Sequence, residues 1–184
     1  MIQPIYLYGS EVLRKKAAPA DLDKKDELKA LIQDLKDTLE RADGCGLAAP
    51  QIGVSTRVVI VDGDVVADVY DYLQGFKRVI INPEILEESD EKVTYSEGCL
   101  SIPSLYCDVL RPAKITLRYT NENFEEVTET LDKFACRMVQ HELSHLDGDL
   151  FVDHVAPIRK KIITKKLQGI SKGRVSARYT TKLK

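Results

Sequence analysis

Apolar side chains recur at helical spacing near the start of the chain. Within residues 23–42 they share one stripe, which consists of Leu28, Leu31, Ile32, Leu35 and Leu39. Positions three and four apart lie on one face of a helix, so this pattern predicts an amphipathic helix. The sequence Asp43-Gly44-Cys45-Gly46 then breaks the period, and the apolar run at residues 57–61 predicts a strand.

A period of two dominates the middle of the chain. Within residues 114–119 apolar side chains alternate with polar ones, and a polar turn at residues 121–123 leads to a strand that should end near Leu131. These two strands are expected to form a hairpin. Further strands are expected at residues 79–86, 92–96 and 106–110. Residues 62–77 hold four aspartates and follow no period, which is typical of an irregular connection.

Two helical patterns follow. In the first, Asp132 is the expected N-cap and Gly148 the expected stop. One face of this helix should carry Phe134, Met138, His141 and His145. The second helix should begin after Pro157, with Lys and Arg between its apolar positions, so that one side docks while the other stays positive. The positions expected to dock are Ile158, Ile162, Leu167 and Ile170.

Composition places these elements in one domain. A chain of 184 residues with 43% hydrophobic content can bury a core without disulfides, and it shows no repeat and no linker. We therefore expect a single domain over residues 1–184, with residues 171–184 as a loose basic tail. Four cysteines without a Cys-x-x-Cys pair or an export signal predict reduced thiols or metal ligands in a cytoplasmic protein.

Charge is distributed unevenly along the chain. Residues 157–184 hold ten Lys or Arg and no acidic residue, which leaves 17 basic residues against 29 acidic ones before them. A basic end on an acidic body suggests a polyanionic partner such as RNA, and a solvated helix face explains the same pattern equally well. No apolar run is long enough to span a bilayer. We expect neither a membrane nor DNA as a partner.

The strongest chemical signal is the sequence His141-Glu142-Leu143-Ser144-His145. Its two imidazoles lie about one helical turn apart and can reach the same metal ion, with Glu142 beside them. A catalytic metal usually has three protein ligands and one open position. The metallopeptidase pattern H-E-x-x-H-x-x-G-x-x-H finds Gly148 but has Phe151 in place of its third histidine. No glutamate follows Glu142, so a downstream Glu ligand is also excluded.

The cysteines upstream are the remaining donors. Cys136 precedes His141 by five residues, a rotation of about 140°, so it should face away from the metal. Cys107 has the context of a small buried hydrophobe. Cys45 lies between two glycines, and the pattern does not decide whether it is a metal ligand. Cys99 lies in a sharp turn, residues 96–103, whose backbone amides and side chains suit a site.

Three separated segments together resemble the motifs of the peptide deformylase family, in the same order. They are Gly44-Cys45-Gly46-Leu47-Ala48-Ala49-Pro50-Gln51, Glu97-Gly98-Cys99-Leu100-Ser101 and Gln140-His141-Glu142-Leu143-Ser144-His145-Leu146. The resemblance covers nearly the whole chain. It implies an α+β fold of antiparallel β-sheets around a central helix that carries H-E-x-x-H, with further helices near both ends.

The resemblance also implies roles for single residues. The metal ligands would be Cys99, His141 and His145, and Glu142 would be the general acid and base. Gln51 and the backbone N–H of Leu100 would form the oxyanion site, while Gly46 and Gly98 would contact the peptide backbone.

Cys45 stands where the family usually has an aliphatic residue near the pocket. Ser144 stands where an acidic residue is usual, so a carboxylate that would support the ligands is expected to be missing. Phe134 and Met138 could wall an apolar pocket for methionine, and ordinary core packing explains them equally well.

The expected activity is removal of the formyl group from the N-formylmethionine of nascent polypeptides, with release of formate. Metal-bound hydroxide would attack the formyl carbonyl, and Glu142 would move the proton to the departing amine. Fe(II) is the metal that the resemblance implies, although the same donors suit Zn, Ni and Co. The basic C-terminal helix would dock at the ribosome, so residues after Pro157 are expected to be dispensable for hydrolysis. Two alternatives remain: a metallopeptidase that cleaves internal amides, and a non-catalytic ribosome- or RNA-binding protein of the same fold.

Overall fold

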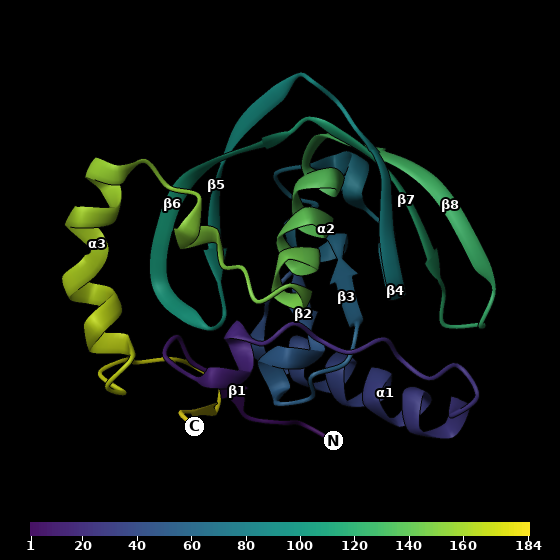
Figure 1. Ribbon diagram of the computed structural model, residues 1–184, viewed down its shortest axis with the longest axis horizontal. Helices are drawn as coiled ribbons and strands as arrows, with labels where there is room; N and C mark the ends of the chain where they lie inside the picture. Colours follow the sequence, from purple (N-terminus) through teal and green to yellow (C-terminus); the bar gives the residue numbers. More distant parts are fainter.

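The computed structural model describes residues 1–184 and shows an α+β fold in which antiparallel sheets surround a central helix (Figure 1). The α-helices are α1 (Lys25–Ala42), α2 (Lys133–Leu146) and α3 (Pro157–Ile170). The strands are β1 (Ile5–Tyr6), β2 (Gly46–Ala48), β3 (Val58–Asp62), β4 (Lys77–Glu88), β5 (Lys92–Cys99), β6 (Ile102–Pro112), β7 (Lys114–Thr120), β8 (Glu126–Asp132) and β9 (Thr181–Lys182). The predicted fold class and the predicted helices are confirmed.

Two antiparallel sheets enclose α2. The larger sheet has the order β2-β3-β4-β7-β8, and β5 pairs with β6 in the smaller one. β7 pairs with β8 along its whole length, from Lys114 opposite Asp132 to Thr120 opposite Glu126, which confirms the predicted hairpin. In Figure 1, α2 lies between the β5–β6 pair and the larger sheet, α1 crosses below β2 and β3, and α3 lies outside β6.

Packing holds α2 in place. Met138, Val139, Leu143 and Leu146 are almost fully buried and belong to one apolar cluster with residues of β3 and β7. Burying each such side chain stabilises the fold by about 1.5–3 kcal/mol. The helix is therefore a rigid support for the side chains that it carries. No helix has both the length and the apolar composition that crossing a bilayer requires.

Residues 62–77 form the irregular connection that the sequence predicts. They contain two short 3₁₀ turns, Gly63–Val66 and Asp71–Leu73. The carboxylate of Asp62 accepts a hydrogen bond from the backbone N–H of Asp64, and Lys77 bridges both aspartates at 3.2 and 3.1 Å. Two of the four aspartates thus have a local structural role.

The docking face of α3 differs from the expectation. Ile158 and Ile162 are 75% and 65% exposed, whereas Ile163, Leu167 and Ile170 are buried. Adjacent residues lie about 100° apart around a helix, so Ile162 and Ile163 cannot both face the body. Ile163, Leu167 and Ile170 lie at spacings of four and three residues, so they form the one face of α3 that docks.

The prediction of a loose tail at residues 171–184 is wrong. β9 pairs in parallel with β1, where the N–H groups of Ile5 and Leu7 each donate a 2.9 Å hydrogen bond to a carbonyl of the tail. Val175 and Leu183 pack against an apolar cluster of the body, and Tyr179 packs against another. These three side chains anchor an otherwise polar segment, and both chain ends therefore lie at the same edge of the molecule (Figure 1).

Candidate metal centre

Helix α2 begins and ends where the sequence predicts. Asp132 holds the N-cap position, although its side chain caps no helix N–H. Gly148 follows the helix with a φ of 72°, and a Cβ atom there would lie only 2.4 Å from the carbonyl oxygen of Arg14. Glycine is the residue that tolerates both this φ and this close approach. The helix therefore ends on the turn after His145.

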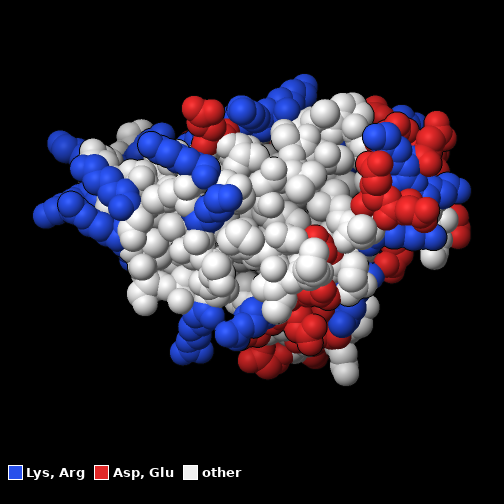
Figure 2. All heavy atoms as spheres, turned by 90° about the horizontal axis from the view of Figure 1, so that it is seen from below, with Lys and Arg blue, Asp and Glu red and all other residues white.

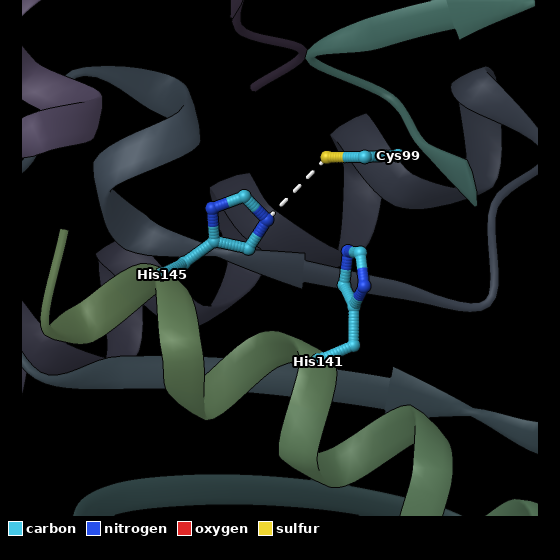
Figure 3. Close-up of side chains that lie close together, drawn as sticks. All are labelled: Cys99, His141 and His145. Carbon is cyan, nitrogen blue, oxygen red and sulfur yellow. Dashed lines mark hydrogen bonds between the residues drawn. The ribbon is translucent and has the colours of Figure 1, made fainter. Parts of the chain in front are cut away.

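Two histidines and one cysteine bring three donor atoms together. His141 and His145 point from consecutive turns of α2 toward Cys99, which lies at the end of β5 (Figure 3). The ligand atoms of the three residues all lie within 4.8 Å of one another, and Cys99 Sγ is 3.4 Å from His145 Nε2. One thiol and two imidazoles are a donor set that suits zinc and the neighbouring transition metals. The cluster therefore fits one divalent metal ion.

The other donors considered from the sequence lie elsewhere. Cys136 is buried on the opposite side of α2, where its Sγ accepts a 3.0 Å hydrogen bond from Gln140 Nε2. Cys107 is buried in an apolar cluster around β6. The ring of Phe151 is buried 5.9 Å from that of His141, so it packs behind a ligand. The predicted positions of Cys136 and Cys107 are confirmed.

A carboxylate supports His141 from behind. Glu97 is 5% exposed, and its Oε1 accepts a 2.8 Å hydrogen bond from His141 Nδ1. Arg111 donates to both oxygens of Glu97, at 2.8 and 3.1 Å, and Arg137 donates to Oε2 at 2.6 Å. Burial opposes the charge of Glu97, but the hydrogen bonds from His141 and Arg111 outweigh it and hold the pKa of the carboxyl well below its usual range.

Glu97 corrects the expectation that Ser144 leaves the ligands without a supporting carboxylate. For His141 the carboxylate comes from β5, and Ser144 Oγ accepts a 3.0 Å hydrogen bond from Arg111. For His145 the expectation agrees with the structure, because its Nδ1 is buried and bonds no protein group. Such partners orient a ligating imidazole and raise its basicity.

Glu142 is a buried carboxylate beside the cluster. The residue is 5% exposed, and its Oε2 is buried without a hydrogen-bond partner. Burial raises the pKa of Glu142 to about 7, although the nearby His141 opposes this shift. A Cβ atom on Gly46 would lie 2.5 Å from Glu142 Oε1, so only glycine leaves room for the carboxylate. Burial, with the charge of Glu142 as a smaller cause, also raises the pKa of Cys45 to about 12.

Two N–H donors lie beside Cys99. Gln51 is buried, and its side chain is fixed because Oε1 accepts from the Ala48 N–H at 2.9 Å while Nε2 donates to Ser101 Oγ at 3.1 Å. The same Nε2 lies 3.5 Å from Cys99 Sγ. The backbone N–H of Leu100, in the turn between β5 and β6, has no acceptor within the protein.

A cavity of about 660 Å³ joins these groups. Nearly all residues singled out from the sequence line it, namely Cys45, Gly46, Gln51, Gly98, Cys99, Leu100, Phe134, Met138, His141 and Glu142. His145 lies behind this surface. The ring of Phe134 stacks on that of Tyr70 at 4.5 Å, and the ring of Tyr106 fills the space where a Cβ atom of Gly98 would lie. Two further features of the wall were not predicted: Arg137, and the tail residues Ser176, Ala177, Arg178 and Tyr179.

The signals that could have identified these missed groups differ in strength. Glu97 lies two residues before Cys99, and a period of two places alternate strand residues on one face. Arg111 and Arg137 come from β6 and α2, and no local pattern relates them to Glu97. Tyr179 lies in a polar segment without a period.

Comparison with known proteins gives a consistent result. The family model described as polypeptide deformylase matches residues 2–161. A peptide deformylase of Christiangramia forsetii is 42% identical, with 97% of this chain and 94% of that protein covered. One of Cytophaga hutchinsonii is 40% identical, with 99% and 97% covered. The crystal structure of a peptide deformylase from Legionella pneumophila matches with a TM-score of 0.81 and 34% identity, over 95% of this chain and 98% of that one.

Proposed function

We propose, from the premise that this chain belongs to the polypeptide deformylase family, that Cys99, His141 and His145 hold one divalent metal ion and that Glu142 is the general acid and base. Members of this family remove the formyl group from N-formylmethionine. The observation that carries the proposal is the geometry of the site: three donors lie within 4.8 Å of one another, and two of them, Cys99 and His141, line the same cavity as Glu142, whose buried carboxylate oxygen has no partner.

The metal that we propose for the cell is Fe(II), and Zn, Ni or Co can replace it in purified protein because thiolate and imidazole suit all four. When bound, such an ion supplies Lewis-acid chemistry, which lowers the pKa of water and polarises a carbonyl group. Glu97 holds the His141 ring by its Nδ1, which leaves Nε2 for the metal. The protein thus selects one tautomer of this ligand.

Glu142 moves the proton. A general base works best when its pKa lies near the pH at which the enzyme operates, and burial raises the pKa of Glu142 to about 7. The carboxylate first accepts a proton from the attacking water. It then delivers that proton to the amine nitrogen as the bond between this nitrogen and the formyl carbon breaks. The products are formate and a free amino terminus.

Gln51 and Leu100 bind the developing negative charge on the formyl oxygen. Gln51 Nε2 keeps a fixed orientation because both ends of the amide are hydrogen-bonded. The N–H of Leu100 needs no reorganisation to donate, because it has no acceptor within the protein. Donors that are already oriented stabilise a transition state without reorganisation at the moment of reaction.

The substrate lies along the cavity from the metal toward the aromatic end. Met138 and Phe134 project from α2 about one and two turns before His141 and offer an apolar wall for a methionine side chain. Gly46 and Gly98, on β2 and β5, both line the cavity, and their backbones are the proposed contacts of the peptide substrate. Cys45 contributes a neutral thiol because its pKa is raised to about 12.

Ribosome docking is proposed for the exposed face of α3. Figure 2 shows Lys and Arg gathered at the end of the molecule where α3 lies, while both signs of charge mix at the opposite end. Lys160, Lys161 and Lys165 form no ion pair, and the exposed Ile158 and Ile162 lie among them. A positive face with no acidic residue attracts the phosphates of RNA.

The test combines metal analysis with two substrates. Protein purified without oxygen should hold about one metal ion per chain and release formate from a formyl-Met peptide, with no cleavage of the same peptide without its formyl group. Mass spectrometry of the products distinguishes loss of the formyl group from cleavage of an internal amide. Internal cleavage without formate release would instead support a metallopeptidase, and metal binding without any turnover would support a binding protein.

A further inference from the structure

The C-terminal tail, defined as residues 171–184, reaches the active site. After α3 the chain turns back below the body and ends in β9, which pairs with β1 near the N-terminus (Figure 1). On the way, Ser176, Ala177, Arg178 and Tyr179 form part of the cavity wall. The tail thus lines the same cavity as Cys99 and Glu142.

Tyr179 makes the most specific contact of the tail. Its ring is half-buried and packs against the apolar cluster of α1, β2 and β3, as the side chain of Leu100 also does. Its hydroxyl donates a 2.7 Å hydrogen bond to the carbonyl oxygen of Leu100. This is a short hydrogen bond to a residue that lines the cavity and whose own N–H bonds no protein acceptor.

The backbone of Leu100 has few other restraints. It lies in the turn between β5 and β6, so no strand ladder holds it. The next residue is better tied, because Ser101 accepts from the Tyr8 N–H at 2.8 Å and from Gln51 at 3.1 Å. The N–H and the carbonyl of Leu100 belong to two adjacent planar peptide units, and the φ and ψ angles of Leu100 set the orientation of one plane relative to the other, so a restraint on the carbonyl limits the directions open to the N–H.

We propose that the C-terminal tail is part of the active site. In this proposal Tyr179 is a positioning residue that orients the Leu100 N–H toward the formyl oxygen. This inference rests on the proposed function of Leu100 as an oxyanion donor. It also replaces the expectation that residues after Pro157 are dispensable for hydrolysis, because only α3, and not the tail, is remote from the cavity.

The test is Tyr179→Phe, which removes the hydroxyl and keeps the ring. Loss of a whole oxyanion donor costs roughly 10²–10³ in kcat, so misaiming one should lower kcat by about tenfold. KM and the metal content per chain should stay within about twofold, because the donor acts on charge that develops in the transition state. The control is Tyr6→Phe on β1, whose hydroxyl bonds no protein group and whose ring lies beside the same tail.

Nuclear magnetic resonance of the zinc-loaded protein gives a readout that needs no activity. The backbone amide signal of Leu100 should shift in Tyr179→Phe and keep its position in Tyr6→Phe, because only the first variant loses the hydrogen bond to the Leu100 carbonyl. If the parent protein releases no formate, the proposed function fails, while this signal still tests the hydrogen bond between Tyr179 and Leu100. Unchanged kcat or an unchanged Leu100 amide signal in Tyr179→Phe would overturn the proposal. So would a parallel loss of metal and kcat, which indicates a merely structural role.

A truncated chain that ends at Gly173 provides a second variant. It lacks the hydroxyl, the cavity wall and β9, so its kcat should fall at least as far as that of Tyr179→Phe. Full kcat in a folded truncated chain would also overturn the proposal. Retained circular dichroism and cooperative unfolding establish that the truncated chain is folded.

Discussion

Helices α2 and α3 have the same length, 14 residues, and opposite environments. α2 buries 11 of its side chains, including Arg137, Gln140, His141, Glu142 and His145. α3 buries only Ile163, Leu167 and Ile170 and leaves all its cations in solvent. Both helices carry polar residues between apolar ones, so the difference arises from where the fold places them.

The comparison teaches that charged residues act differently when they are buried and when they are exposed. A buried charged group interacts strongly at short distance and must be paired, so α2 depends on single atoms and their geometry. Exposed charges are screened within about 8–10 Å at ordinary ionic strength, so α3 acts through the sum of its charges. Single substitutions should therefore have large effects on α2 and small effects on α3.

The largest effect is expected for Glu142→Gln. The variant keeps the shape of the side chain and loses the group that moves the proton, so kcat should fall by about 10²–10⁴. Formate release measures this loss, and metal analysis should show unchanged binding because Glu142 is not a ligand. Retained turnover in the variant would show that Glu142 is not the general acid and base.

The next effect concerns the support behind the metal ligands. Glu97→Ala leaves Arg111 and Arg137 buried without their carboxylate, which should cost about 3–5 kcal/mol in the free energy of unfolding. The His141 ring also loses its partner, so metal affinity should fall by about 10–100-fold. Chemical denaturation and competition with a chelator measure the two losses separately.

The control is Glu84→Ala on β4, whose pair with Arg118 is exposed. Exposed pairs contribute about 0–1 kcal/mol, so this variant should remain close to the parent protein in stability. Equal losses in Glu97→Ala and Glu84→Ala would contradict the contrast between buried and exposed charges.

Lowering the pH should remove the charge of the same buried carboxylate, Glu97, without changing the shape of its side chain. The pKa of Glu97 is lower in the folded state than its ordinary value of 4.5, so the stabilisation is present above that value and is lost as the pH falls below it. Glu97→Gln, which cannot ionise, should show a flatter decline of the metal-free protein in acid. Thermal unfolding between pH 3 and 6 compares the two slopes, and identical slopes would contradict the assignment.

The smallest effect on the enzyme itself is expected on α3. A triple change of Lys160, Lys161 and Lys165 to Gln should leave kcat unchanged and shift the unfolding free energy by no more than about 0.5 kcal/mol per site. Ribosome binding should weaken, with a salt slope lower by about 2–3 if each lysine meets one phosphate. Sedimentation with ribosomes at several salt concentrations measures this change.

The matched control for α3 changes Lys16, Lys29 and Lys114, which are exposed and form no ion pair. This triple variant removes the same charge from other faces of the molecule. If both triple variants lose ribosome binding equally, net charge explains the binding and α3 is not a docking surface.

Local hydrophobic patterns predicted the helices and strands whose packing depends on residues that are near in sequence. The stripe within residues 23–42 and the alternation within residues 114–119 describe packing that each element makes on its own, and both predictions are confirmed. The ligands Cys99, His141 and His145 could be proposed because three motifs together resemble a family, and the structure brings them into one cluster.

What could not be predicted depends on distant residues. Ile162 and Ile163 are both apolar, so the pattern alone could not show which of them α3 buries. The carboxylate of Glu97 meets its arginines only after β6 and α2 have folded beside β5. The tail lacks a period because three anchoring side chains, rather than an apolar stripe, hold it in place.

The parallel pairing of β1 with β9 links the first residues of the chain to the last. During synthesis, Ile5 leaves the ribosome long before its partner Thr181, because 175 residues lie between them in the sequence. Contacts so far apart in sequence form late, because a long loop must close before they are gained. Tyr179 emerges with the same segment, so the hydrogen bond that restrains the turn at Leu100 can form only after the 78 residues between them have been made.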